Sequence, residues 1–171
     1  EAVFGMHNWP NAKAGCLGVV PGPMMASSNE FELSIQGKGS HAAQPHLSTD
    51  PVMVAVQIAQ SWQTIISRNK NPLDAGVLSI TQIHSGSATN IIPDSATMIG
   101  TVRTFTMEAL DLIESRMGEM ASHTAAAFGA SVEFHFRRNY PPLINHEPET
   151  AFAAEIMSEV VGKDGVLKKL E

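Results

Sequence analysis

The most informative part of this 171-residue chain begins with Phe31-Glu-Leu-Ser-Ile-Gln36 and continues through Gly37-Lys-Gly-Ser-His-Ala-Ala-Gln-Pro45 to Asp50-Pro51. Apolar and polar residues alternate along its first six positions, which predicts a strand with one buried face. Asp50 is a favourable helix N-cap, and Pro51 suits the first helical position. The loop that carries His41 therefore lies between a strand and a helix, where binding and catalytic groups are common.

Periodic apolar residues continue on the C-terminal side of this stretch. Spacings of three and four residues predict one helix from residue 51 to about residue 68, and a second from a Thr106 cap to a Gly129 stop. The apolar stripe of the second helix consists of Leu110, Ile113, Met117, Met120, Ala121, Thr124 and Phe128. Residues that are β-branched or alternate in polarity predict further strands over residues 76–84, 95–105 and 132–137.

The predicted order of elements is strand, helix, strand, strand, helix, strand. This order favours an α+β fold, a ferredoxin-like βαββαβ sandwich with a four-stranded antiparallel sheet and both helices on one face. Residues 1–26 and 139–171 do not fit that unit. We expect them to belong to a neighbouring domain into which residues 27–138 are inserted, and we expect the chain to be a fragment of a longer protein.

Composition limits the possible classes of function. A net charge of -6 with 11 basic residues gives no electrostatic footprint for nucleic acid or an anionic membrane. No apolar run approaches the ~20 residues that span a bilayer. Cys16 is the only cysteine, which excludes an intramolecular disulfide and makes the cytoplasm the expected location. We expect this thiol to be a small buried filler.

Five short strings occur in order along the chain: Gly5-Met-His-Asn-Trp-Pro10, Gly37-Lys-Gly-Ser-His-Ala-Ala-Gln-Pro-His46, Asp50-Pro51, Ala88-Thr-Asn-Ile-Ile-Pro-Asp94 and Gly100-Thr-Val-Arg103. Together they resemble the metal-dependent aminoacylase and carboxypeptidase superfamily, and within it the branch of hippurate hydrolase and the indole-acetyl-amino-acid hydrolases. Members of that family are well over twice this length. The resemblance implies a catalytic domain with a dinuclear metal site, here represented by residues 1–26 and 139–171, and a lid or dimerisation domain over residues 27–138.

The resemblance also assigns roles to four residues. His7 resembles a metal-ligand histidine, with zinc or manganese as the ion. His41 resembles the lid histidine that reaches into the partner subunit's active site and donates a hydrogen bond to the oxyanion. Asn90 resembles an asparagine that contacts substrate. Arg103 resembles the arginine that grips the substrate's free carboxylate, a task that suits a guanidinium fork.

Each of these residues also has a simpler interpretation. A lone histidine at position 7 is no metal site, because such a site needs three or four ligands. The family's Cys-Gly-His-Asp-x-His string and Glu-Glu pair are absent from these residues, so we expect no complete dinuclear site. His41 would be a solvated turn histidine, or a residue near the helix that interacts with Asp50, and Gly37 and Gly39 would serve the turn alone. Asn90 would tolerate an unusual backbone angle, and Arg103 would form a surface salt bridge.

The sequence therefore predicts part of a hydrolase that cleaves the amide bond of N-acyl amino acids, such as N-benzoyl or N-acetyl conjugates, with a divalent metal pair. We expect a homodimer in which the edge strand of residues 76–84 pairs with its symmetry mate. The alternative is a free-standing ferredoxin-like module that binds a small ligand or dimerises without catalysis. RNA binding is disfavoured by the negative charge and the lack of paired aromatics. We expect His46 and His84 to be structural or surface residues.

Overall fold

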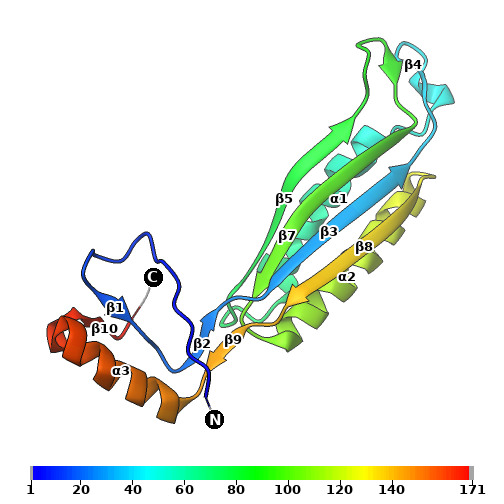
Figure 1. Cartoon of the computed structure of the whole chain (residues 1–171). Helices are drawn as coiled ribbons and strands as arrows, with labels where there is room; N and C mark the ends of the chain where they lie inside the picture. Colours follow the sequence, from blue (N-terminus) through cyan, green and yellow to red (C-terminus); the bar gives the residue numbers. More distant parts are fainter. Residues whose placement is uncertain (1, 170–171) are drawn as a thin grey trace. The chain divides into compact units, whose positions relative to one another are not determined.

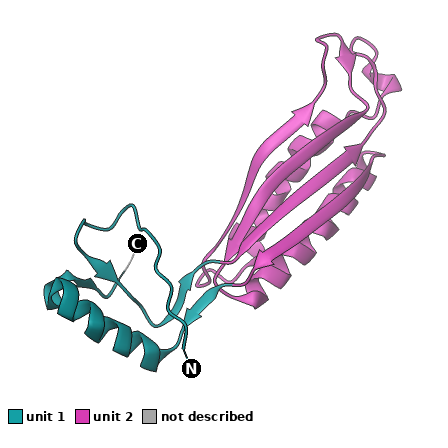
Figure 2. Ribbon diagram, viewed as in Figure 1, with its two compact units in different colours: residues 1–26, 142–171 teal, residues 27–141 magenta. Residues whose placement is uncertain are grey.

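The computed structural model describes residues 2–169, which form two compact units (Figure 2). Unit 2 comprises residues 27–141. Unit 1 comprises the two flanking segments, which end at residue 26 and resume at residue 142. Unit 2 is thus an insertion within the chain of unit 1.

Unit 2 is built on a four-stranded antiparallel sheet with two helices on one face (Figure 1). Its elements are β3 (Ser28–Gln36), α1 (Pro51–Thr64), β5 (Gly76–Ser85), β7 (Ser95–Thr104), α2 (Met107–Ala127) and β8 (Ser131–Tyr140). The strands lie in the order β5-β7-β3-β8, and every neighbouring pair is antiparallel. This arrangement is the predicted ferredoxin-like βαββαβ sandwich.

Both helices begin and end at residues that favour a helix boundary. The Asp50 carboxylate accepts two backbone N–H groups in the first turn of α1, where Pro51 fits because that position needs no donor. The Thr106 hydroxyl accepts a backbone N–H at the start of α2. One π-helical turn, η2 (Ile65–Asn69), extends α1. Gly129 stops α2 with a φ of 74°, a left-handed conformation that glycine adopts without strain.

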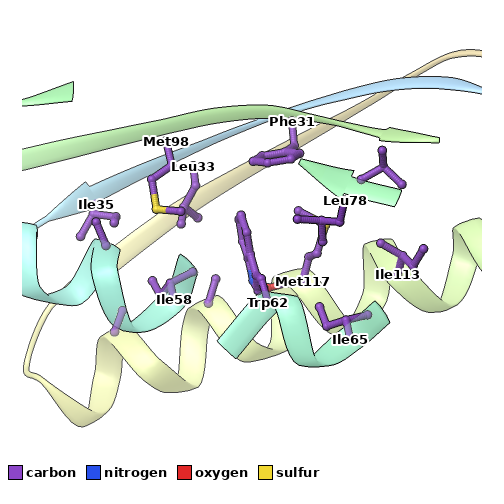
Figure 3. Packing of buried hydrophobic residues seen from close by; sticks show 14 of the residues in the cluster. Phe31, Leu33, Ile35, Ile58, Trp62, Ile65, Leu78, Met98, Ile113 and Met117 are labelled. Atoms are coloured by element: carbon purple, nitrogen blue, oxygen red, sulfur yellow. The ribbon is translucent and has the colours of Figure 1, made fainter. Parts of the chain in front are cut away.

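The core of unit 2 lies between the sheet and the two helices (Figure 3). Alternate residues of β3, beginning with Phe31, are buried on the helix-facing side, as their periodicity predicted. Trp62 of α1 is fully buried, and its ring meets Phe31 edge-on at 5.2 Å and Phe134 at 5.9 Å between centroids. The Trp62 indole N–H donates to the Met117 carbonyl of α2 at 3.0 Å. One side chain therefore connects the sheet with both helices.

The last residue of the predicted stripe on α2 lies outside the core. Phe128 is 48% exposed. It is the C-cap residue, one position beyond the end of α2, so its side chain no longer follows the buried line of the helix. That line instead continues through Ala121 and Ala125, whose small side chains let α2 pack closely on the sheet.

The described part of unit 1 contains short strands drawn from both flanks, the α-helix α3 (Glu147–Val161) and the short 3₁₀ helix η3 (Lys163–Gly165). β1 (Leu17–Gly18) pairs in parallel with β10 (Val166–Leu167), and β2 (Gly22–Met25) pairs antiparallel with β9 (Leu143–Asn145). The apolar runs of each flank thus have their partners on the other side of the insertion. Within residues 2–169, no helix is long and apolar enough to cross a membrane.

Candidate functional site

The loops that carry His41 and Asn90 lie side by side at one end of the sheet of unit 2 (Figure 1). β4 (Ser40–His41) pairs antiparallel with β6 (Ile91–Ile92), and the Ala42 N–H donates to the Asn90 carbonyl at 2.9 Å. We call the two loops, residues 37–50 and 86–94, the tip. The tip joins the predicted oxyanion donor to a predicted substrate contact.

Two glycines allow the loops of the tip to approach closely. A Cβ at Gly37 would collide with the carbonyl oxygen of Thr49, and a Cβ at Gly39 would lie 2.5 Å from the carbonyl oxygen of Ile92. Neither glycine has a positive φ. The two glycines therefore serve these loops through the space that they leave and not through a left-handed backbone conformation.

Asp94 is a residue of the tip that no sequence pattern singles out. Its carboxylate Oδ1 accepts the Gly39 N–H at 2.8 Å and so connects its own loop with the loop that leads to His41. Two signals were available in the sequence. One was the carboxylate of Asp94 at the end of its loop, and the other was the Gly-x-Gly sequence in the neighbouring loop. Their contact could not be recognised before the two loops were known to be neighbours.

His41 is exposed, and its imidazole is oriented by its own loop. The Ala43 backbone N–H donates to His41 Nδ1 at 3.1 Å. Because a backbone amide can only donate, Nδ1 carries the lone pair and the ring proton of neutral His41 is on Nε2. His41 thus presents an N–H donor, as an oxyanion contact requires. The alternative partner, Asp50, is engaged in capping α1.

Asn90 is exposed and lies directly before β6. No residue other than glycine has a positive φ in the described part of the chain, so the interpretation of Asn90 as a residue with an unusual backbone angle is wrong. Its backbone carbonyl accepts the Ala42 N–H, as described above. Its side-chain amide makes no hydrogen bond with any other described residue. Both its donor and its acceptor are available to a ligand.

Arg103 lies near the opposite end of the sheet from the tip. It pairs with Val77 at the start of β5 and is eight positions after Ser95, the residue of β7 that follows the tip. At the usual rise of a strand, this separation is about 26 Å. A single unit 2 therefore cannot bring Arg103 to the same small ligand as His41 and Asn90.

The guanidinium of Arg103 rests on the backbone of its own sheet. Its Nη1 donates to the Asn29 carbonyl at 3.1 Å and also contacts the Thr101 hydroxyl. Arg103 makes no ion pair within residues 2–169, so the salt-bridge interpretation is wrong. Its Nε and Nη2 remain available, and two adjacent guanidinium nitrogens can hold a carboxylate in bidentate fashion.

His7 is exposed and lies in unit 1, and its Nδ1 bonds to the Asn8 carbonyl at 2.5 Å. Because a carbonyl only accepts, Nδ1 carries the proton and Nε2 has a lone pair to offer a metal ion. Among the side chains that the structure describes, no group of three or more His, Cys, Asp or Glu could hold a metal. His7 could supply one ligand to a zinc or manganese ion, but it does not form a metal site by itself.

The other histidines and the cysteine stand apart from these residues. His46 is exposed in a short 3₁₀ helix of the tip, η1 (Pro45–Leu47). His84 bonds to Gln82 at 2.9 Å on β5. Cys16 is a free thiol and is half-buried rather than fully buried.

A second surface feature lies along the edge of the sheet. β5 is an edge strand, and a shallow groove of about 360 Å³ separates it from α1. The groove is lined by Ala59, Gln60, Gln63 and residues 80–83. Helix α1 has no charged residue from Pro51 to Thr64, and the apolar side chain of Met53 on it is 49% exposed. An uncharged exposed helix beside an open strand edge is typical of a protein interface.

Comparisons with known proteins connect this arrangement with a family. The family model of the peptidase dimerisation domain matches residues 26–128. The N-acetylcysteine deacetylase of Bacillus subtilis is 44% identical over 145 residues, which are 85% of this chain and 38% of that protein. An N-acetyldiaminopimelate deacetylase of Listeria monocytogenes is 35% identical over 159 residues, which are 93% of this chain and 43% of that protein.

Solved structures show the same relationship. A dinuclear metal-binding peptidase of the M20 family from Bacillus subtilis matches with a TM-score of 0.74 and 33% identity, over 98% of this chain and 41% of that one. A tripeptidase from Staphylococcus aureus shares the fold, with a TM-score of 0.71 and 23% identity over 92% of this chain and 41% of that one. The chain spans about two fifths of the length of the relatives that it matches. Since the family model covers more than half of it, the chain belongs to the M20 peptidase dimerisation-domain family.

Proposed function

We propose that this chain is part of a longer amidohydrolase subunit that cleaves the amide bond of small N-acyl amino acids. Unit 2 would be its lid, and unit 1 would belong to its catalytic domain. The observation that carries the proposal is the tip, where the Nε2–H of His41 and the free amide of Asn90 lie on paired loops. Two relatives are deacetylases of N-acetyl amino acids. An acetyl group is therefore favoured over the benzoyl group of hippurate.

Each predicted residue has a role in this reaction. His7 would be one ligand of a pair of zinc or manganese ions, which supplies polarisation of the amide carbonyl and activation of water. The Nε2–H of His41 would donate to the oxyanion that develops when the amide is attacked. Asn90 would hold the substrate beside it. Arg103 would bind the free carboxylate of the amino acid through Nε and Nη2.

The separation within unit 2 supports a division of these proposed contacts between two active sites. His41 and Asn90 share the tip, whereas Arg103 is about 26 Å away along β7. One substrate cannot touch all three residues of the same subunit. Each site of a homodimer would therefore combine the tip of one subunit with the partner subunit's Arg103.

The homodimer would form along the edge of the sheet. β5 would pair with its copy across a two-fold axis, and the uncharged side of α1 would pack on its copy. Pairing of the two edges satisfies backbone groups that an isolated edge leaves to water. The same contact would fill the groove between β5 and α1.

Mixed dimers of the complete hydrolase test this proposal. His41→Ala alone should lower kcat for N-acetyl-L-cysteine by about two to three orders of magnitude. When His41→Ala and Arg103→Ala subunits are refolded together, half of the dimers are mixed and each has one intact site. Activity should then recover to about one quarter of the wild-type value.

A mixture of His41→Ala and Asn90→Ala subunits provides the control. It should recover no activity, since both residues belong to the tip and each mixed site then has one defect. Recovery in both mixtures would place Asn90 in the other half of the site. Recovery in neither mixture would contradict sites shared between subunits.

The acyl preference needs a separate assay. The same enzyme, supplied with zinc or manganese, should hydrolyse N-acetyl-L-cysteine or N-acetyldiaminopimelate faster than hippurate. Faster turnover of hippurate would overturn the acetyl preference and leave amide hydrolysis intact. Failure to hydrolyse all three substrates would favour the alternative, a ferredoxin-like module that binds a small ligand or dimerises without catalysis.

A further inference from the structure

Asp94 is the residue at which the two loops of the tip are tied together. Besides the bond from the Gly39 N–H to its carboxylate, its backbone carbonyl accepts the Gly37 N–H at 2.8 Å and the Gln36 side-chain amide at 3.1 Å. Three donors from the segment that leads to His41 therefore end on one residue. That residue follows Asn90 by four positions.

The carboxylate bond is the only one of the three that a substitution of Asp94 can remove, because the other two end on its backbone carbonyl. It is charge-assisted, so it is stronger than a bond between neutral groups. Packing cannot replace it, because Gly39 has no side chain and stands against the Ile92 carbonyl. The Gly39 N–H would be left to water if the carboxylate were lost.

His41 lies between two connections to the same neighbouring loop. Gly39, two residues before it, is held by the Asp94 carboxylate, and Ala42, one residue after it, is held by the Asn90 carbonyl. The ring is then oriented from within by the Ala43 N–H. Without the first connection, the Gly39 end of β4 would lose one hydrogen bond to the neighbouring loop and could shift, while the pairing of β4 with β6 remains.

We propose that Asp94 is a positioning residue that keeps the Nε2–H of His41 in register with the amide of Asn90. This inference rests on the proposed function of His41. Asp94 itself is exposed and outside the core, so its replacement should leave the sandwich folded. A displacement of a reacting group by about 1 Å can cost on the order of 100-fold in rate.

A double-mutant cycle in the complete hydrolase tests the inference. Asp94→Ala should lower kcat by about 10- to 100-fold and change KM by less than about threefold. In a His41→Ala background the same substitution should cost nothing further, because it acts through His41. Asp94→Asn, which keeps an oxygen acceptor, should retain more activity than Asp94→Ala. Glu108→Ala removes an exposed acid at the start of α2 and should leave kcat unchanged.

The outcomes separate this inference from the proposed function. An equal loss in both backgrounds would mean that Asp94 does not act through His41, and no loss in either would mean that it positions nothing. Either result overturns the inference while the effect of His41→Ala stands. If His41→Ala itself leaves kcat unchanged, the proposed function fails, and with it the inference that depends on it.

Amide hydrogen exchange on the 171-residue chain gives a readout that does not require activity. Asp94→Ala should speed exchange at Gly39 and Ala42 and leave the core strand residue Met98 unchanged. Unchanged exchange at Ala42 would show that the carboxylate does not hold β4 in place. Faster exchange at Met98 as well would indicate general destabilisation and would overturn a positioning role.

Discussion

Gly100 sets the packing at the centre of the sheet by having no side chain. It lies in β7 directly opposite Phe31 in β3 and Ile80 in β5. A Cβ at this position would collide with the Phe31 ring and with the Ser79 carbonyl oxygen. The string Gly100-Thr-Val-Arg103 therefore begins with a packing requirement and ends with a proposed substrate contact.

Replacing this glycine should destabilise unit 2. Gly100→Ala is expected to lower the free energy of unfolding by about 1–3 kcal/mol, because either the Phe31 ring or the backbone of β5 must move. Urea unfolding followed by circular dichroism measures this change.

The same substitution in a helix provides the matched control. At Gly118 of α2 a Cβ would make an ordinary contact with the Phe134 ring at 3.4 Å. Gly118→Ala should therefore raise the free energy of unfolding by about 0.5–1 kcal/mol, since alanine favours a helix interior. A Gly100→Ala variant that equals the wild type would contradict the packing described for Phe31.

At the scale of elements, α1 and α2 are joined by one hydrogen bond in the core. Trp62→Phe keeps an aromatic ring against the sheet but removes the donor to the Met117 carbonyl. We expect a loss of about 1–2 kcal/mol in the free energy of unfolding. Trp62→Ala, which also empties the space, should cost about 3–5 kcal/mol. A Trp62→Phe variant that is as stable as the wild type in urea unfolding would show that the hydrogen bond does not contribute separately.

The two long helices and the four strands of the main sheet of unit 2 could be predicted because local signals decide them. The Asp50 and Thr106 caps act within one helical turn, and the alternation along β3 reports its buried face directly. The pairing of β1 with β10 could not be predicted in this way. Two-residue strands have no measurable period, and their partners lie on opposite sides of the insertion.

The residues of the candidate site were proposed from the resemblance, whereas their arrangement could not be predicted. His41, Asn90 and Arg103 each stand in a string that resembles the family, and their roles stay predictions. The pairing of β4 with β6 depends on the close approach at Gly39 and leaves no periodic signal. The contact of Asp94 could not be predicted, because its partner is a backbone N–H and the sequence does not distinguish this N–H from any other.

At the scale of the whole molecule, the proposed dimer depends on the open edge formed by β5 and α1. Ile83 of β5 is 50% exposed and lines the groove between them. Ile83→Lys should raise the dimer dissociation constant by about tenfold or more, because two-fold symmetry would bring the new charge into the interface twice. Analytical ultracentrifugation over a range of concentrations measures this constant.

A matched substitution in unit 1 controls for added surface charge. Val160 of α3 is 74% exposed, and Val160→Lys should leave the dissociation constant unchanged. A wild-type chain that sediments as a monomer at every micromolar concentration would contradict the proposed interface. So would an equal weakening by both lysine variants.

The burial of Trp62 also makes the protein its own optical probe. The chain has two tryptophans, and the indole of Trp62 is screened from water within unit 2. Trp62 should emit at the short wavelengths that are typical of an apolar environment. Its emission maximum should shift to longer wavelength when water reaches the ring. In a Trp9→Phe variant all tryptophan emission would come from the inserted unit. The rates at which unit 2 unfolds and refolds could then be measured by stopped-flow fluorescence, independently of unit 1.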